Sequence, residues 1–334
     1  MQRTATVLTG TDLRALLSLS DVVPAVEAAY VAAARQEAQV YPVVREPLPG
    51  SAGVYGVKSG YWPQRSLLGL KVAGYWARNR AAGLDNHQAL IVLTDPRTGV
   101  PRAIIDGNVI TAVRTSAAGA IGLKFLARPD ARSALIVGTG VQAGAQAQAL
   151  DWWRPGIELA VHEPAGAVQA AAAAEVDFCD LLAGQGISAR PAGPLAGAVA
   201  AADVVVTATP ATRPVISRDW LRRGVHVNAM GADTAGKQEH EVATLRSALV
   251  VVDDWAQASV LGECQHAAHA GIFTADDHPH SIGEIIAGTA AGRTGADQLT
   301  LFDATGLALQ DLAAAELALQ LAAARGIGQS VTLD

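Results

Sequence analysis

The fold is decided by the stretch Ser133-Ala134-Leu135-Ile136-Val137-Gly138-Thr139-Gly140-Val141-Gln142-Ala143. An apolar strand runs directly into the pattern G-x-G-x-x-A, and an Ala-rich helix follows. Gly138 permits the tight turn, Gly140 lets the backbone approach a pyrophosphate, and the small Ala143 lets the helix pack closely on the strand. The helix N-terminus offers unpaired N–H groups to the phosphates. Because the glycines stand between a strand and a helix, the stretch predicts a dinucleotide-binding site.

An acidic residue follows the next predicted strand. Glu163 comes after the strand at 157–161, about 20 residues beyond the glycine loop. A carboxylate there accepts the ribose hydroxyls of NAD and repels the 2′-phosphate of NADP, and the turn 162–166 contains no Arg to receive that phosphate. The sequence therefore favours NAD over NADP, with a solvated loop glutamate as the alternative interpretation.

The pattern of strands and helices predicts an α/β protein with two domains. From residue 133 onward strands at 133–137, 157–161, 203–207, 225–230 and 249–253 alternate with helices, which is typical of a Rossmann-type, doubly wound parallel sheet. Short β-type runs at 54–59, 68–74 and 89–93 indicate a separate antiparallel sheet. We expect an NAD-binding Rossmann domain at 129–302 and a discontinuous α+β substrate domain at 1–128 plus 303–334, to which a helix at 306–325 returns.

Composition and charge exclude several classes of protein. The formal net charge is −6, no basic run could follow a phosphate backbone, and aromatic residues make up only 4% of the chain, so no nucleic-acid partner is expected. No run approaches about 18 uninterrupted apolar residues, so no membrane partner is expected either. The two cysteines, Cys179 and Cys264, make no disulfide framework and favour buried thiols in the cytoplasm.

Four cations stand beside apolar or glycine positions of the first predicted domain: Arg45, Lys58, Lys71 and Arg114. Burying a charge is costly unless the charge is paired, so cations within apolar strands indicate internal ion pairs or an anionic ligand. A single such residue is more often a side chain whose charged end reaches water. Four of them beside a nicotinamide site favour a carboxylate pocket, because an Arg binds a carboxylate through two parallel N–H bonds.

The chain resembles the ornithine cyclodeaminase and mu-crystallin family over essentially its whole length. Besides the glycine loop, the segment Asp106-Gly107-Asn108-Val109-Ile110-Thr111-Ala112-Val113-Arg114-Thr115-Ser116-Ala117-Ala118 looks like the family's most recognisable helix. Residues 230–239 are similar to its G-x-D-x-x-G-K-x-E pattern, and residues 262–265 and 302–306 also fit. The resemblance implies a homodimer in which the first domain pairs two protomers through their sheets, and it agrees with the division into two domains.

The resemblance also implies roles for individual residues. Arg45 and Lys71 would contact the substrate carboxylate and the reacting nitrogen, and Asp233 would be the catalytic acid/base, with His87 as a rival proton donor. Thr305 would lie at the substrate edge, and Lys58 and Arg114 would be further substrate-binding cations. The nucleotide site of Gly138, Gly140 and Glu163 would be completed by Asn86, His87, Arg114, Thr115, Thr139, Val141, Gln142, Thr207, Lys237 and Ala304.

Within the family, the stretches 55–60, 69–76 and 83–88 look most like the bacterial iminosuccinate reductases, which reduce iminosuccinate to L-aspartate with NADH. An imine with two carboxylates needs cationic binding groups at two places, which the four cations offer. Ornithine would instead need an acidic group to bind its distal ammonium. The expected partner is thus a small imino or amino acid. Alternatives are an ornithine cyclodeaminase, an alanine dehydrogenase, a cyclic ketimine or pyrroline-2-carboxylate reductase, or a non-enzymatic, mu-crystallin-like binding protein.

No metal site is expected. Glu263, Cys264, His266 and His269 could share one helical face, but zinc needs converging ligands with support behind them, and scattered surface histidines are commoner.

Overall fold

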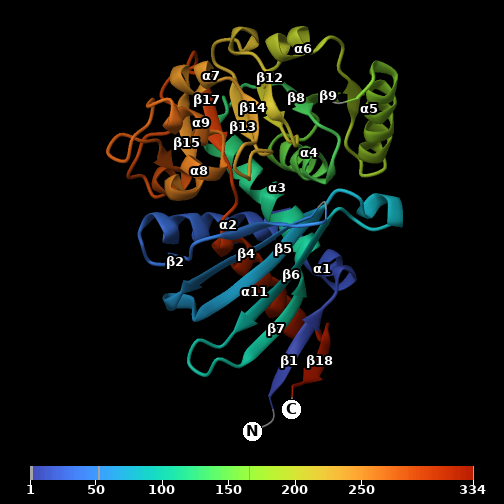
Figure 1. Ribbon diagram of the computed structural model, residues 1–334, viewed down its shortest axis with the longest axis vertical. Coiled ribbons are helices and arrows are strands. Elements are labelled where there is room, and N and C mark those ends of the chain that lie inside the picture. The colour runs from blue at the N-terminus through green and yellow to red at the C-terminus, as the bar shows by residue number, and fades with distance from the viewer. Residues whose placement is uncertain (1–2, 52, 165, 334) are drawn as a thin grey trace. The chain divides into compact units, whose positions relative to one another are not determined.

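The computed structural model describes residues 3–51, 53–164 and 166–333 and has the predicted α/β fold class (Figure 1). It divides into two compact units: Met1–Arg114 with Leu307–Asp334, here the first unit, and Thr115–Gly306, the second unit. The expected domain boundaries, after 128 and before 303, fall near these divisions. They differ mainly in that helix α3 (Gly107–Leu126) contributes residues to both units.

The described residues of the first unit form an eight-stranded sheet in the order β18-β1-β7-β6-β5-β4-β2, with β3 also paired to β4. β1 and β7 run parallel and the other neighbours are antiparallel. The predicted runs at 54–59, 68–74 and 89–93 lie within β4, β5 and β6, which confirms the antiparallel sheet. The strands are β1 Thr4–Leu8, β2 Gln39–Val40, β3 Val44–Leu48, β4 Gly53–Trp62, β5 Leu67–Trp76, β6 His87–Thr94, β7 Pro101–Asp106 and β18 Gln329–Thr332.

Helix α11 (Ala308–Arg325) returns to the first unit as predicted and packs on β4, β5 and β6. The close approach depends on glycine: a Cβ at Gly69 would stand 2.8 Å from Leu312 Cδ2, and one at Gly60 would stand 3.3 Å from Leu309 Cδ2. The N-terminal end of α11 therefore lies directly against the inner face of the sheet. The other helical segments of this unit are α1 Gly10–Leu16, α2 Leu19–Ala34 and the short turns η1 Pro63–Arg65 and η2 Asn79–Ala82.

The second unit is a doubly wound sheet, as predicted. Its described residues form eight parallel strands in the order β10-β9-β8-β11-β13-β17-β15-β16, beside a two-stranded sheet of β12 and β14. The chain winds outward from β8 on one side and resumes at β11 on the other, so the carboxyl ends of β8 and β11 mark the switch point at which such folds bind ligands. The strands are β8 Ser133–Val137, β9 Glu158–His162, β10 Ala189–Pro191, β11 Val204–Thr207, β12 Thr212–Ile216, β13 His226–Ala229, β14 Gln238–His240, β15 Leu249–Val252, β16 His280–Ser281 and β17 Thr300–Asp303.

Strand β17 was not predicted. It is four residues long and lies between β13 and β15, so its place comes from tertiary pairing and not from a strong local pattern. The helices of this unit are α4 Val141–Trp153, α5 Val168–Ala183, α6 Leu195–Ala201, α7 Val242–Ser247, α8 Trp255–Leu261, α9 Cys264–His269, α10 Ile282–Ile286 and the turn η3 Arg218–Trp220.

By length and composition, helix α3 is long and apolar enough to cross a membrane. However, 72% of its apolar 18-residue stretch is buried within the protein. Glycines bring its second half into contact with the parallel sheet, since a Cβ at Gly122 would lie 2.6 Å from Asn228 Oδ1 and 2.7 Å from Phe302 Cδ1. The burial is that of a core helix.

Candidate functional site

The glycine loop joins β8 to α4 at the carboxyl edge of the parallel sheet. Gly138 has a φ of 116°, donates its N–H to the carbonyl oxygen of His162 at 2.8 Å, and would bring a Cβ to 2.6 Å from the oxygen of Ala208. Gly140 precedes α4 as its N-cap, and a Cβ there would meet nothing within 4 Å. The open space at the helix N-terminus fits a pyrophosphate, as the motif predicts.

Glu163 lies beside this loop, where the sequence placed it. The Thr139 hydroxyl donates to Glu163 Oε2 at 2.6 Å, and the Glu163 N–H donates to Glu175 Oε1 at 3.0 Å. Glu175, a buried carboxylate on α5, also lies 3.1 Å from Nδ1 of His162. The loop and a fixed acidic side chain at the end of the neighbouring strand fit the ribose of an NAD molecule. Glu175 was not predicted as a site residue; its one sequence signal is that it directly follows the alanine run 170–174.

The other residues expected at the nucleotide differ in exposure. Val141, at the first position of α4, is exposed, and Gln142 is half-buried. Ala304, after β17, is buried and donates its N–H to Ala229 O at 3.2 Å. Thr207, at the end of β11, is fully buried, and its hydroxyl lies 2.9 Å from Glu239 Oε2 and 3.0 Å from His240 Nε2.

Asp233 stands in the loop between β13 and β14, in the second unit. Its Oδ1 accepts from Lys237 Nζ at 2.7 Å and from the Thr234 hydroxyl at 3.1 Å, and the Asp233 carboxylate remains partly exposed. Lys237, expected at the nucleotide, donates also to the oxygen of Gly231 at 3.0 Å. The two residues therefore form one charged pair across the turn.

The buried carboxylate of Glu239 anchors this loop through hydrogen bonds. Glu239 accepts from the Gly231 N–H at 2.9 Å through Oε2, and from the Thr209 N–H at 2.7 Å and hydroxyl at 2.8 Å through Oε1. Burial raises the pKa of Glu239 even though these donors oppose the shift. Glu239 was visible in the sequence as the last letter of the G-x-D-x-x-G-K-x-E pattern, but its anchoring function depends on strand pairing that the pattern does not show.

Three further carboxylates of the second unit are buried: Asp253, Asp303 and Glu263. The Thr305 hydroxyl, expected at the substrate edge, is buried, donates to Asp253 Oδ1 at 2.8 Å and accepts from Gln257 Nε2 at 2.6 Å. Burial raises the pKa of Asp303 to about 7. Glu263 accepts from the N–H of Glu239 at 2.6 Å. Among the described residues no group of three or more His, Cys, Asp or Glu is arranged to hold a metal ion.

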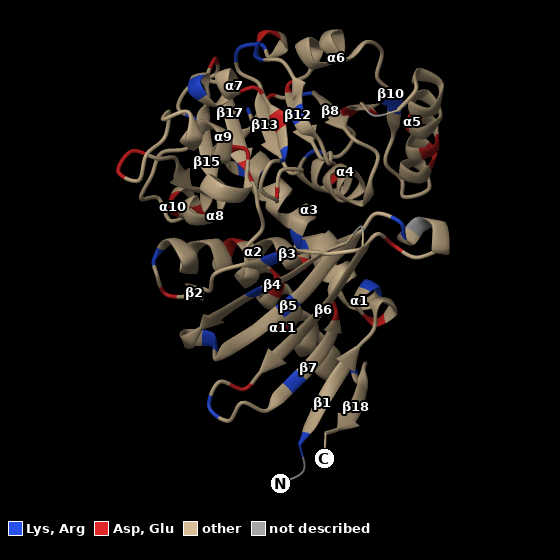
Figure 2. Ribbon diagram, viewed as in Figure 1, with Lys and Arg blue, Asp and Glu red and all other residues tan. Residues whose placement is uncertain are grey.

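Two of the predicted cations of the first unit, Lys71 and Arg114, contact an acidic residue that the sequence did not indicate, Asp311. Lys71 on β5 is 3% exposed, and its Nζ lies 2.7 Å from Asp311 Oδ2 and 3.2 Å from the Thr111 hydroxyl. Arg114 on α3 donates from Nε to Asp311 Oδ1 at 2.9 Å. Lys58 stands opposite Lys71 in the register of β4 and β5, where Figure 2 shows basic segments on neighbouring strands. Arg45 is half-buried on β3, opposite Gly56 of β4.

The charged groups of this cluster shift one another's pKa values. Burial lowers the pKa of Lys71 to about 7, Asp311 opposes the shift, and Arg114 and Lys58 add to it. Burial alone would raise the pKa of Asp311, but Lys71 and Arg114 outweigh it and lower the value. Asp311 is therefore ionised at neutral pH, while Lys71 is balanced between its charged and neutral forms.

His87, on β6, interacts electrostatically with this cluster, and Asn86 precedes it in the chain. The His87 Nδ1 is 3.1 Å from Asn108 Oδ1, and burial together with Lys71 lowers the pKa of His87. A neutral imidazole at pH 7 is a weak candidate for the proton donor. Asn86 donates from Nδ2 to the Tyr75 hydroxyl at 3.1 Å. Thr115, assigned to the second unit, accepts from Gln146 Nε2 at 2.9 Å through its carbonyl.

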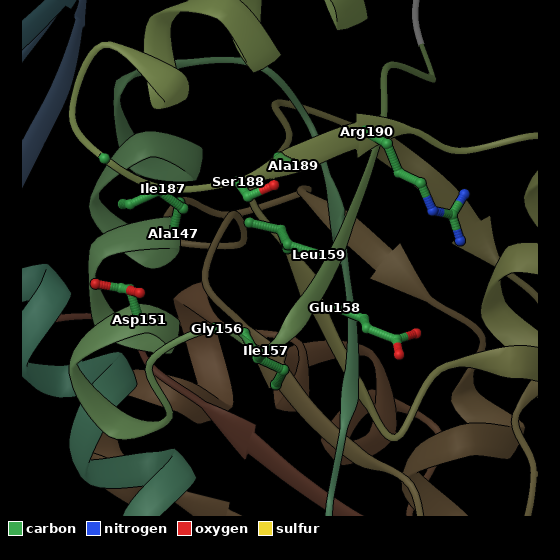
Figure 3. A pocket seen from close by; sticks show the side chains of 11 residues that line it. Ala147, Asp151, Gly156, Ile157, Glu158, Leu159, Ile187, Ser188, Ala189 and Arg190 are labelled. Carbon is green, nitrogen blue, oxygen red and sulfur yellow. The ribbon is translucent and has the colours of Figure 1, made fainter.

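A cavity of about 390 Å³ lies elsewhere on the second unit (Figure 3). Asp151, Glu158 and Arg190 are among its lining residues, and it opens at the amino ends of β9 and β10. The glycine loop and Glu163 stand at the opposite, carboxyl edge of the same sheet. The cavity is therefore distinct from the predicted nucleotide site.

Comparison with known proteins extends these observations. The model of the ornithine cyclodeaminase/mu-crystallin family matches residues 3–324. The iminosuccinate reductase of Paracoccus denitrificans is 34% identical over 96% of this chain and 98% of its own length, and its crystal structure with NAD+ superposes with a TM-score of 0.89 over 99% of this chain and 100% of that one. The alanine dehydrogenase of Archaeoglobus fulgidus is 35% identical over 97% of each chain.

A third relative was solved with both cofactor and an amino acid. The Δ1-pyrroline-2-carboxylate reductase of Thermococcus litoralis, in complex with NADH and L-proline, is 29% identical, with a TM-score of 0.90 over 98% of this chain and 100% of that one. The solved structures share the overall fold of this chain, and the names of the three relatives state different substrates. The comparisons thus support the fold and leave the substrate to the chemistry of the site.

Proposed function

Since this chain belongs to the ornithine cyclodeaminase/mu-crystallin family, we propose that it is an NADH-dependent imine reductase that converts iminosuccinate into L-aspartate. The observation that carries the substrate assignment is the number of cations in the first unit. The imine carbon gains a hydride, the nitrogen gains a proton, and both carboxylates stay negative throughout, so the substrate needs fixed positive charge at two places.

The cations divide naturally between the two carboxylates. Lys71 and Arg45 would fix the α-carboxylate beside the imine. Lys58 and the guanidinium N–H groups of Arg114 that do not contact Asp311 would receive the distal carboxylate. An Arg is suited to that second task because its planar donors match a carboxylate in pairs.

The second unit would hold the cofactor. The α4 N-terminus behind Gly140 would bind the pyrophosphate, and Glu163, oriented by Thr139 and Glu175, would accept the ribose hydroxyls. When bound there, NADH supplies the hydride from C4 of its nicotinamide. Asp233 would supply or relay the proton at the substrate nitrogen, with Lys237 orienting its carboxylate at 2.7 Å.

The substrate assignment is tested by NADH oxidation with a panel of acceptors at equal concentration. The panel is iminosuccinate formed from oxaloacetate and ammonium, pyruvate with ammonium, Δ1-pyrroline-2-carboxylate and a cyclic ketimine, with ammonium omitted as control. A marked preference for the four-carbon diacid imine is expected. A preference for a monocarboxylate would instead identify an alanine dehydrogenase or a ketimine reductase. Release of ammonia from ornithine would identify a cyclodeaminase, and ligand binding without turnover would identify a crystallin-like protein.

Replacing Glu163 should change the choice of cofactor. Glu163→Ser removes the carboxylate that binds the ribose and repels a 2′-phosphate, so the ratio of kcat/KM for NADPH to that for NADH should rise about 10- to 100-fold, the effect of one charge-assisted hydrogen bond. Steady-state rates with both cofactors measure the ratio. Glu158→Ser, at the opposite end of the same strand, is the matched control and should leave it unchanged. An unchanged ratio in Glu163→Ser would remove Glu163 from the ribose site.

A homodimer is also proposed, through the outer face of the first unit's sheet. Val44, Val57, Val72 and Leu90 stand in one cross-strand row, and Val44 and Leu90 are both exposed. The row lies on the face away from α11, since Lys71, which contacts α11, alternates with Val72. An apolar row of this kind on a soluble protein favours a protein partner, and one solved archaeal relative is described as an alanine dehydrogenase dimer with bound NAD.

Leu90→Glu should convert the dimer to a monomer. The substitution places a charge at the β6 end of the apolar row, while Leu90 is 45% exposed in the single chain, so folding should be retained. Light scattering after size exclusion should show the mass falling from two chains to one. Val168→Glu, on an exposed position of α5, should leave the mass unchanged. A dimer that persists in Leu90→Glu would place the interface elsewhere.

The reaction is assigned to the cytoplasm. Within the described chain Cys179 and Cys264 are free, buried thiols, which supports a reducing compartment.

A further inference from the structure

We propose that Asp311 is a positioning residue for the substrate-binding cations: it holds Lys71 and Arg114 in one fixed arrangement and increases the share of Lys71 that is charged for an anionic substrate. The proposal deepens the imine-reductase function and rests on it for the identity of the anion. Asp311 is fully buried near the start of α11, and its two oxygens contact the two cations separately, Oδ2 at 2.7 Å from Lys71 and Oδ1 at 2.9 Å from Arg114.

The place of Asp311 is itself fixed by the residue before it. Gln310 accepts from the Leu307 N–H at 2.8 Å at the start of α11, and its amide nitrogen donates to the Tyr30 hydroxyl on α2. The glycines at 60 and 69 let α11 lie against the sheet. Because the helix is anchored at its first turn, the carboxylate stands at a defined position between β5 and α3, and neither cation can turn away without breaking a buried ion pair.

The charge of the cluster indicates a ligand and not merely a structural ion pair. Two buried cations share the Asp311 carboxylate, and Lys58 acts on both Lys71 and Asp311 from the opposite strand. A cluster serving stability alone would be expected to balance its charges, because an excess of buried charge is unfavourable. The positive excess is what an incoming carboxylate would neutralise.

Asp311 also determines the charge state of Lys71. The groups facing Lys71 are Asp311 from α11, Arg114 and Thr111 from α3, Lys58 from β4 and His87 from β6. Burial, Arg114 and Lys58 lower the pKa of Lys71, and Asp311 raises it. Without the carboxylate, the pKa of Lys71 should fall below its value of about 7, and a smaller share of Lys71 should be charged at neutral pH. A neutral lysine retains its donors but loses its charge for binding an anion.

The test is the pH profile of kcat/KM for iminosuccinate, which reports ionisations of the free enzyme. Lys71 is charged below its pKa, so kcat/KM falls as pH rises through that value. In Asp311→Asn this basic limb should move to lower pH by about one unit or more, and the loss relative to wild type should be larger at pH 8 than at pH 6. Glu316→Gln, on the same helix as Asp311, removes an ion pair with Arg102 of β7; it is the control and should keep the wild-type basic limb.

A second variant keeps the test decisive if Asp311→Asn folds poorly. Lys71→Arg carries a cation that does not lose its proton in this range, so its profile should lack the basic limb. The proposal would be overturned if kcat/KM of Asp311→Asn fell equally at every pH and its basic limb stayed at the wild-type pH. It would also be overturned if the pH profile of Lys71→Arg kept the basic limb.

Failure of the proposed function would be recognised separately. If wild type reduces no imine, calorimetric binding of succinate as a dicarboxylate probe replaces kinetics. As pH rises, succinate affinity should be lost in both proteins. If it is lost at a lower pH in Asp311→Asn than in wild type, the role of Asp311 is supported whatever the reaction. Affinity with the same pH dependence in both proteins would contradict it.

Discussion

Asp233→Asn is expected to lose most of the turnover while binding NADH almost normally. The amide keeps the shape of the side chain but cannot accept and release the proton, and general acid–base catalysis contributes about 10²- to 10⁴-fold to rate. The variant also loses the ion pair with Lys237, but both partners are partly exposed, so the free energy of unfolding should change by only about 1 kcal/mol or less. Steady-state kcat with iminosuccinate and fluorescence titration with NADH measure the two quantities.

Asp277→Asn is the control for this experiment. Asp277 is an exposed carboxylate of the same unit, outside the glycine loop and the Asp233 loop. Its kcat should equal that of wild type. Near-normal turnover in Asp233→Asn would contradict the assignment of the proton to Asp233 and direct attention back to His87, despite its lowered pKa.

Lys71→Met is expected to weaken substrate binding by about two orders of magnitude in kcat/KM. Loss of one partner from a buried charge contact costs about 2–5 kcal/mol, and the incoming carboxylate would lose that partner. Most of the change should appear as a higher KM, because the carboxylate keeps its charge from substrate to product. Folding should be retained, since Asp311 still contacts Arg114 at 2.9 Å and is not left as an uncompensated charge.

Lys124→Met provides the comparison, since it removes a lysine charge from an exposed position of α3. Both variants and wild type are compared by KM for iminosuccinate and by thermal unfolding. An unaltered KM in Lys71→Met would exclude Lys71 from the anion site. A raised KM for both lysine variants would point to a general effect of net charge.

Features encoded by a short, local pattern could be predicted from the sequence. The glycine loop needs only a strand, three small residues and a helix in order, and Glu163 lies at the end of the next strand, so the pairing of β8 with β9 brings it beside Thr139. The alternating strands and the return of the last helix were predicted for similar reasons. Each depends on neighbours in the chain or on a rule of parallel sheets.

Features that depend on distant partners could not be predicted. Asp311 meets Lys71 and Arg114 only because α11 packs on β5, and nothing local distinguishes this Asp from a solvent-facing one on an Ala-rich helix. Burial of Thr207 against Glu239 has the same origin. The lowered pKa of His87 likewise follows from burial and from Lys71 on the neighbouring strand, which sequence alone does not show.

The central claim is that the chain delivers hydride to the imine carbon of iminosuccinate, and transfer of label tests it most directly. NADH carrying deuterium at both C4 positions is incubated with oxaloacetate, ammonium and the purified protein, and the products are analysed by mass spectrometry and NMR. We expect L-aspartate with one deuterium at Cα, in proportion to the NADH oxidised. Deuterated malate, reflecting reduction of the keto acid, or absence of labelled aspartate would contradict the account.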